Sequence, residues 1–198
     1  MEDVYKTIET PAEGLYKEKG SKFIALAYPV RTEAAVKEIV GEIKVRYYDA
    51  RHHCYAYRLG ADKKKFRAND DGEPSSTAGK PILGQILSYD LTDILIVVVR
   101  YFGGIKLGVS GLINAYRAAA ADAIGHARIV EKTDDEVFRI KFDYTVMNEV
   151  MRVVKEEEPE VMSRDFSMEC RMTLSIRKQN AFRLSSRLQQ IESLSFEN

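Results

Sequence analysis

Four glycines and a lysine lie between an apolar run and a segment with helical spacing. The apolar run, Ile94–Val99, is predicted to be a fully buried strand, and the helical spacing begins at Leu112. Glycine permits positive φ angles and lets backbone N–H groups approach a ligand closely. The start of the following helix adds partial positive charge and unpaired N–H groups, which together favour an anion. The residues of this candidate anion site are Arg100, Gly103, Gly104, Lys106, Gly108, Ser110 and Gly111.

The same glycines also fit a tight turn with close packing, and the motif chemistry alone favours that simpler role. Their spacing matches neither a Walker loop, nor a dinucleotide fingerprint, nor a nucleophile elbow. A second candidate anion site is the helix start at Ser75–Thr77 and Gly79–Pro81, with a simple helix cap as the alternative. No nucleophile–base pair emerges from the sequence, so we predict no catalytic residue, no metal and no cofactor.

Three carboxylates, Asp70, Asp71 and Glu73, follow His52 and His53 with one predicted strand between them. Carboxylates and imidazole can hold a metal or form an acid–base pair. The spacing matches no metal signature, and an Asp-Gly pair is ordinary turn chemistry, so a turn is the favoured interpretation. Because successive residues of a strand point to opposite faces, we expect at most one of the two histidines to face a shared site.

Cations and aromatic rings are interleaved from residue 46 to residue 67. Nucleic-acid-binding proteins use this mixture, with cations for phosphates and rings for bases. The alternative is that the tyrosines fill the faces of a sheet and the lysines form a solvated loop tip. The cations that we add to the candidate nucleic-acid site are Lys63, Lys64, Lys65 and Arg67.

The bulk properties are those of a soluble globular protein. The formal net charge is zero, which argues against a strongly basic nucleic-acid-binding protein but leaves room for a local patch. No apolar run is long enough to cross a membrane, and the N-terminus lacks the layout of a signal peptide. The two cysteines lie far apart, as expected for reduced thiols. We therefore expect a cytoplasmic protein without membrane contact.

The periodicities predict an α+β protein whose pattern restarts after a polar linker at 128–135. Before the linker we expect a hairpin at 14–17 and 22–30, a helix after Thr32, a strand at 54–59, a long surface loop at 61–77, a helix from about Pro81, a strand at 93–99 and a helix from 110 to about 126. After the linker we expect a strand at 136–142, a helix at 144–157, a strand pair at 160–166 and 168–176, a helix at 180–191 and a short tail, which matches most of a ferredoxin-like split βαβ unit.

Several of these segments carry a resemblance to the YigZ/IMPACT family. The matching segments, in matching order and separation, are Ala50–Arg58, Asp70–Pro74, Thr77–Pro81 and Val97–Gly108. The resemblance implies an IMPACT-type domain at 1–131, with the fold of the second domain of a small-subunit ribosomal protein that also occurs in elongation factor G and GHMP kinases. It implies a ferredoxin-like C-terminal domain at 136–198. It also implies a shared surface formed by His52, Asp70, Asp71, Gly72 and Glu73.

The family is linked to translation control, and its eukaryotic members restrain a stress-responsive kinase by competing for its activator. Those members carry an extra N-terminal domain, whereas this sequence starts directly at the shared domain, so we do not expect the kinase-pathway role here. The favoured hypothesis is a non-enzymatic protein that binds RNA or the ribosome. The alternatives are a small-molecule enzyme that holds a phosphorylated ligand at the glycine turn, with Asp71 or Glu73 as base, and a protein–protein adaptor.

Overall fold

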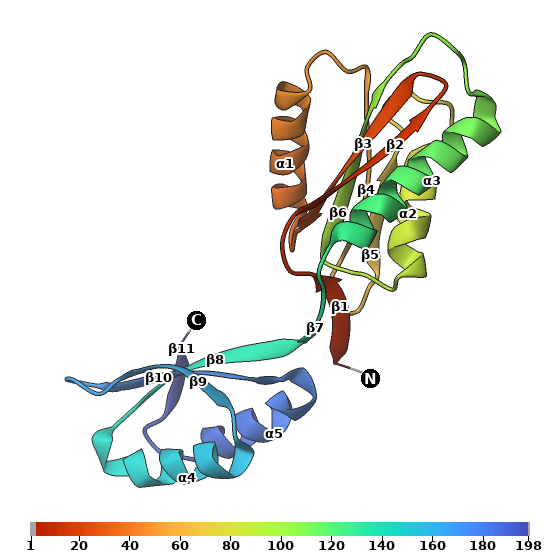
Figure 1. The fold of residues 1–198 in the computed structure, drawn as a ribbon. Coiled ribbons are helices and arrows are strands. Elements are labelled where there is room, and N and C mark those ends of the chain that lie inside the picture. The colour runs from red at the N-terminus through yellow and green to blue at the C-terminus, as the bar shows by residue number, and fades with distance from the viewer. Residues whose placement is uncertain (1–2, 198) are drawn as a thin grey trace. The chain divides into compact units, whose positions relative to one another are not determined.

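A computed structural model describes residues 3–197, which divide into two compact units (Figure 1). The larger unit is Tyr5–Lys132, and the smaller unit contains the described residues on either side of it. The segment 128–135, expected to be a polar linker, instead contains strand β7 (Ile129–Thr133), which pairs with β1 (Val4–Ile8). Most of β7 is exposed, so the sequence lacks the apolar alternation that announces a strand.

The larger unit is built on a five-stranded sheet in which every neighbouring pair is antiparallel. Its spatial order is β2 (Ala12–Glu18), β3 (Ser21–Pro29), β6 (Ile94–Tyr101), β4 (His52–Leu59) and β5 (Lys65–Asn69). The central strand β6 contains the apolar run 94–99, and each of these six side chains is fully buried. The predicted buried strand is therefore confirmed.

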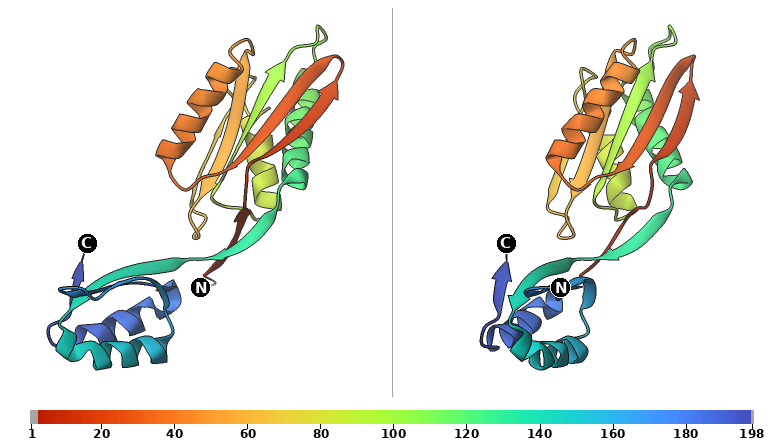
Figure 2. Two further views of the ribbon diagram at one scale, coloured as in Figure 1. Left: turned by 60° about the vertical axis from the view of Figure 1, so that its left-hand side comes forward. Right: turned by 90° about the vertical axis from the view of Figure 1, so that its left-hand side faces the viewer.

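Helices cover both faces of this sheet (Figure 1, Figure 2). Helix α1 (Glu33–Arg46) packs on one face, in a core that includes Val97 and Val99. Helices α2 (Gly79–Ser88) and α3 (Gly108–His126) pack on the other face, in a core that includes Ile96 and Val98. This double coverage explains why β6 is apolar throughout instead of alternating.

The predicted surface loop at 61–77 is wrong in two respects. Residues 65–69 form β5, an edge strand in which even the apolar Phe66 and Ala68 are exposed. Its polar and apolar residues alternate over too few positions within a polar segment to predict a strand, and the charges of Lys65 and Arg67 protect the open edge of the sheet. Farther along, Glu73 and Thr77 are buried, because the chain turns back beneath the N-terminus of α2.

The smaller unit has a four-stranded antiparallel sheet with helices α4 (Met147–Glu157) and α5 (Lys178–Gln189), whose side chains share its core. The strands lie in the order β11 (Ser195–Glu197), β8 (Asp135–Phe142), β10 (Cys170–Arg177) and β9 (Glu160–Asp165), and a short 3-10 turn (Tyr144–Val146) precedes α4. The residues expected to form a short tail thus supply an edge strand. No helix in the part of the chain that the structure describes is long and apolar enough to span a bilayer.

Candidate functional site

A pocket of about 830 Å³ opens in the larger unit, where β4 begins and β6 ends. His52 pairs with Arg100 across these two strands, and both side chains line the pocket. The rest of the wall comes from three segments: Asp49–Arg51 before β4, Glu73 and Pro74 before α2, and the glycine turn with the first residues of α3. We call this space the β4–β6 pocket. Its volume is in the range that small-molecule sites occupy.

A buried carboxylate, Glu73, forms the polar floor of the β4–β6 pocket. Its side chain is 3% exposed, and its Oε1 accepts hydrogen bonds from Arg100 Nη1 at 2.6 Å and from the Tyr116 hydroxyl at 2.7 Å. Burial, followed by the neighbouring Cys54 and Glu73, raises the pKa of Tyr116, so the phenol keeps its proton and donates it. Burial also raises the pKa of the Cys54 thiol, which donates to the Asp70 carbonyl.

Arg100 and Lys106 both line the pocket, but Arg100 is already paired within the protein. Its side chain is 10% exposed, and its guanidinium pairs with Glu73 and lies 5.8 Å from the centroid of the exposed Phe102 ring. A cation that is already paired and largely buried binds phosphate less readily than a free one. The structure thus places Arg100 at the pocket as part of its frame.

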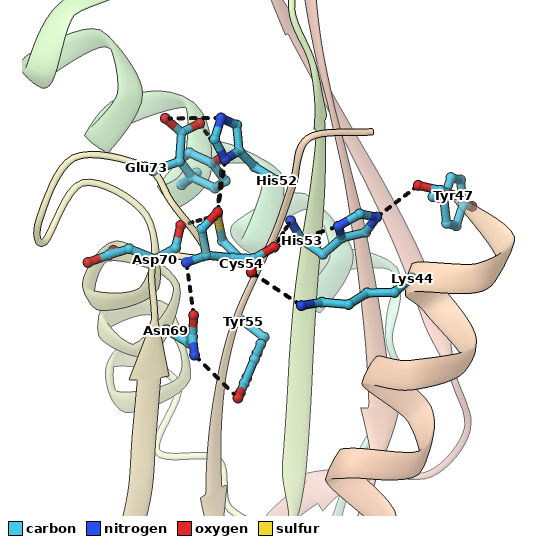
Figure 3. Close-up of polar contacts among 11 residues, drawn as sticks. Lys44, Tyr47, His52, His53, Cys54, Tyr55, Asn69, Asp70 and Glu73 are labelled. Carbon is cyan, nitrogen blue, oxygen red and sulfur yellow. Dashed lines mark hydrogen bonds and ion pairs between the residues drawn. The ribbon is translucent and has the colours of Figure 1, made fainter. Parts of the chain in front are cut away.

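The two histidines lie on opposite faces of β4, as expected (Figure 3). His52 lines the pocket, and its Nδ1 lies 2.9 Å from the Asp71 carbonyl oxygen. Because a carbonyl only accepts, Nδ1 carries the proton of that bond, and in the neutral ring Nε2 keeps its lone pair. His53 is buried on the α1 side, where its Nε2 donates to the Tyr47 carbonyl at 2.8 Å.

The side chain of Asp71 stabilises the loop and does not line the pocket. Its Oδ2 accepts from the His53 backbone N–H at 2.8 Å and its Oδ1 from Lys44 Nζ at 3.2 Å. Burial acts to raise the pKa of Asp71, but the His53 N–H and Lys44 outweigh burial and lower it. Asp71 and Gly72 both have positive φ, so this segment forms the turn that was the favoured interpretation of the sequence. Of the expected shared surface, His52 and Glu73 reach the pocket side by side.

The glycine turn serves close packing and also opens toward the β4–β6 pocket. A Cβ on Gly103 would lie 1.9 Å from the carbonyl carbon of Gly20, so the two backbones touch there. Gly104 and Gly108 have φ of +93° and +74°, which favour glycine. Ser110 and Gly111 lie in the first turn of α3 behind them. The glycines of this turn therefore serve close packing, and this role is compatible with anion binding.

The N-terminus of α3 lacks a side-chain cap and borders the pocket. Its capping residue, Leu107, supplies no side-chain hydrogen bond, and Leu107, Gly108 and Val109 line the pocket beside Lys106. Lys106 and Arg51 are exposed and form no ion pair within residues 3–197. The sequence reasoning placed Arg51 in a basic cluster but not at this site.

The other candidate anion site, at the start of α2, is occupied by the chain itself. Asp70 Oδ1 accepts from the N–H groups of Ala78 and Gly79, and its Oδ2 accepts from that of Ser76. The helix-cap alternative is therefore the one observed, with Asp70 as the acceptor. Asp70 is consequently part of the framework, and it is not free to contact a ligand.

The lysine-rich segment lies away from the β4–β6 pocket. Lys65 pairs with Leu59, which is at the opposite end of β4 from His52. Lys63 forms an ion pair with Asp90 at 2.6 Å, and Lys65 forms one with Glu33 at 2.8 Å. The structure thus separates Lys63, Lys64, Lys65 and Arg67 from Arg100 and Lys106, and the nucleic-acid role of these four cations stays a prediction.

The comparisons with known proteins agree on one family. Residues 19–124 match the model of the Impact N-terminal domain. The chain is 36% identical to IMPACT family member YvyE of Bacillus subtilis (strain 168), over 78% of this chain and 71% of that protein. It is 33% identical to IMPACT family member YigZ of Escherichia coli (strain K12), over 75% and 74% respectively. A crystal structure of a hypothetical protein, 27% identical, matches 99% of this chain and 97% of its own with a TM-score of 0.73. The chain belongs to the IMPACT family.

Proposed function

We propose that this IMPACT-family protein is a non-enzymatic binding protein that acts in translation by contacting RNA through the β4–β6 pocket. One observation carries the proposal: Arg51 and Lys106, which form no ion pair within residues 3–197, and the exposed Phe102 line the same pocket as the N-terminus of α3, which no side chain of those residues caps. Cations and free N–H groups bind phosphate, and an exposed ring stacks on a base.

Family membership supports the connection with translation, because the resemblance described above links the family to translation control. The topology supports the expected ferredoxin-like unit: β8-α4-β9 and β10-α5-β11 each join two strands that flank one antiparallel strand. For the larger unit, we retain the ribosomal-protein-like domain as the proposed fold relative. A cytoplasmic location follows from the same proposal, because the RNA of translation is there.

The test is the salt dependence of binding to a single-stranded RNA, measured by fluorescence anisotropy. Log affinity should fall linearly with log salt concentration, since each phosphate contact releases counterions. Lys106→Ala should reduce the slope by about 0.7, the value for one phosphate of a single strand, and should weaken binding to all sequences alike.

The matched control is Lys64→Ala, at the far end of β4. If the RNA lies in the β4–β6 pocket, this variant keeps the wild-type slope. If the salt slope falls in Lys64→Ala and not in Lys106→Ala, the RNA binds at the lysine-rich segment instead of the pocket. An RNA affinity of the wild-type protein that does not change with salt contradicts the proposal. A protein partner captured from lysate at high salt after nuclease treatment would favour the alternative of a protein–protein adaptor.

The second candidate is a small-molecule enzyme that binds a phosphorylated ligand. The observation that favours it is the pocket itself, a bounded space of about 830 Å³ with the carboxylate of Glu73 at its floor. Asp71, the other proposed base, is engaged with Lys44 and the His53 backbone, so Glu73 is the better placed carboxylate. A phosphorylated metabolite that raises the melting temperature and is consumed by the protein would establish this alternative.

A further inference from the structure

The floor of the β4–β6 pocket presents two hydrogen-bond acceptors side by side. His52 Nε2 lies 4.0 Å from Glu73 Oε2. The other ring nitrogen of His52 donates to the Asp71 carbonyl, which leaves Nε2 as an acceptor in the neutral ring. Glu73 Oε1 already accepts two hydrogen bonds, from Arg100 and Tyr116, whereas Oε2 accepts none from the described residues. With the ring neutral, an acceptor nitrogen and an acceptor oxygen therefore lie 4.0 Å apart at the pocket.

This arrangement is incomplete by the usual standard of buried polar groups. The Glu73 side chain is 3% exposed, and its Oε2, which accepts no hydrogen bond from the described residues, is the oxygen left to face the pocket. Arg100, with a side chain 10% exposed, also has a buried Nε without a partner. The cluster thus holds more polar atoms than its own members satisfy, and Glu73 and His52 border the open space of the pocket.

A ligand group that carries two N–H bonds on one atom completes the pair, because it can donate to both acceptors. A primary amino group has this property, whereas a carbonyl or a ring nitrogen without hydrogen does not. Other lining residues of the pocket have the reverse chemistry: Lys106 and the uncapped N-terminus of α3 suit a phosphate. Together the two sets of groups fit a ligand that carries both a phosphate and an amino group.

We propose that the β4–β6 pocket selects a nucleotide whose base carries an exocyclic amino group, which donates to His52 Nε2 and Glu73 Oε2. This inference rests on the proposed RNA function and names the part of the strand that enters the pocket. The phosphate of that nucleotide lies at the N-terminus of α3, and Phe102 is the exposed ring available for stacking. A free nucleotide has the same chemistry as a nucleotide within a strand, so the experiment includes both.

The experiment compares bases that differ in the amino group and little else. RNA strands of equal length carry adenine or purine, and guanine or hypoxanthine, at their central positions, and affinities are measured by anisotropy. The amino-bearing strand should bind about fivefold more tightly, as expected for one net hydrogen bond of about 1 kcal/mol. The monophosphates of adenosine and purine riboside are compared in parallel by calorimetry.

The decisive variant is His52→Asn. A carboxamide N–H at this position can still donate to the Asp71 carbonyl, while the Nε2 acceptor is lost. Discrimination between the paired strands should fall to less than twofold, with the salt slope unchanged. Glu73→Gln is the second variant, checked for folding by its thermal transition, and it should also lose discrimination.

The outcomes separate this inference from the function on which it rests. Salt-dependent binding without discrimination, or discrimination that survives both variants, overturns the amino-group inference and leaves RNA binding intact. No salt-dependent binding of any strand overturns the proposed function. Discrimination among the strands alone supports a site for RNA, and equal discrimination among the monophosphates supports the same acceptor pair with a free nucleotide as its ligand.

Discussion

Helices α2 and α3 lie on the same face of one sheet, but a side chain caps the N-terminus of only one of them. At α2 an acidic side chain from the same chain, Asp70, accepts three backbone N–H groups. At α3 no side chain caps the helix, and its first residues border a pocket beside a free lysine. Both termini carry the same partial positive charge. The carboxylate of Asp70 gives the N-terminus of α2 a structural role. The N-terminus of α3 has no such carboxylate and is available to an anion from outside the chain.

The comparison also explains why two candidate anion sites look similar in the sequence. Both have small residues, a lysine and the start of an apolar helix. What distinguishes them is where Asp70 lies, six to nine residues before the N–H groups that it binds. Local spacing does not reveal a cap that the chain delivers from so far upstream.

The largest effect is expected from removing the internal carboxylate. Asp70→Ala leaves the N–H groups of the buried residues Ala78 and Gly79 without an acceptor, which should reduce the free energy of unfolding by about 2–4 kcal/mol. Chemical denaturation measures the loss. Asp70→Asn keeps one acceptor oxygen and should lose less than half as much. Ser110→Ala, in the first turn of α3, should change stability by less than about 0.5 kcal/mol. Equal losses of unfolding free energy in Asp70→Ala and Ser110→Ala would contradict the difference proposed between the two helix N-termini.

An intermediate effect is expected from giving α3 the charge that α2 already has. Ser110→Asp places a carboxylate in the exposed first turn of α3, which should stabilise folding by about 0.5 kcal/mol and weaken RNA binding roughly fivefold to tenfold. Thermal unfolding and anisotropy report the two changes. Ser110→Asn, of similar size and no charge, should leave RNA affinity within about twofold. Tighter RNA binding by Ser110→Asp would mean that no anion lies at this terminus.

The smallest effect is expected for Asp71, which lies in the same loop as Asp70 and affects the free energy of unfolding. Because the folded protein lowers the pKa of Asp71, this carboxylate contributes stability above its unfolded pKa of about 3.9, and the contribution is lost as the pH falls through the lower folded value. Asp71→Asn should therefore cost about 1 kcal/mol at pH 7 and progressively less as the pH falls from about 3.9 through the lower folded pKa. Denaturant unfolding across this range gives the difference, and a cost that is independent of pH would show that the charge of Asp71 does not matter.

Much of the fold was predictable because its signals are local. Three features follow from neighbouring residues: the buried strand at 94–99, the hairpin at Lys19–Gly20 and the N-cap of α1. The N-cap is Thr32, whose hydroxyl accepts a hydrogen bond from the Ala35 N–H. The strands that were missed, β1, β5, β7 and β11, are short, and in all of them except β1 most residues are exposed. Short strands depend on hydrogen bonds to neighbouring strands, and the sequence of the strand itself does not record those bonds.

The candidate site was only partly predictable, because it is assembled from distant segments. The hydrogen bond between Tyr116 and Glu73 joins residues 43 positions apart, and Tyr116 stands in an alanine-rich helix that reads as ordinary core. Glu73 looked like a residue of a polar loop, yet it is buried. The lysines at 63–65 looked like part of the site, but the register of β4 and β5 carries them to the other end of the sheet.

The two cysteines give each unit an internal reporter of unfolding. Cys54 is buried in the larger unit and Cys170 in the smaller one, and both are free thiols. A buried, protonated thiol is inert toward alkylating reagents until the surrounding structure opens. The rate at which each thiol is modified, followed by mass spectrometry of its peptide, therefore measures how often each half of the native protein opens. The same experiment, repeated with RNA present, shows which half the ligand holds closed.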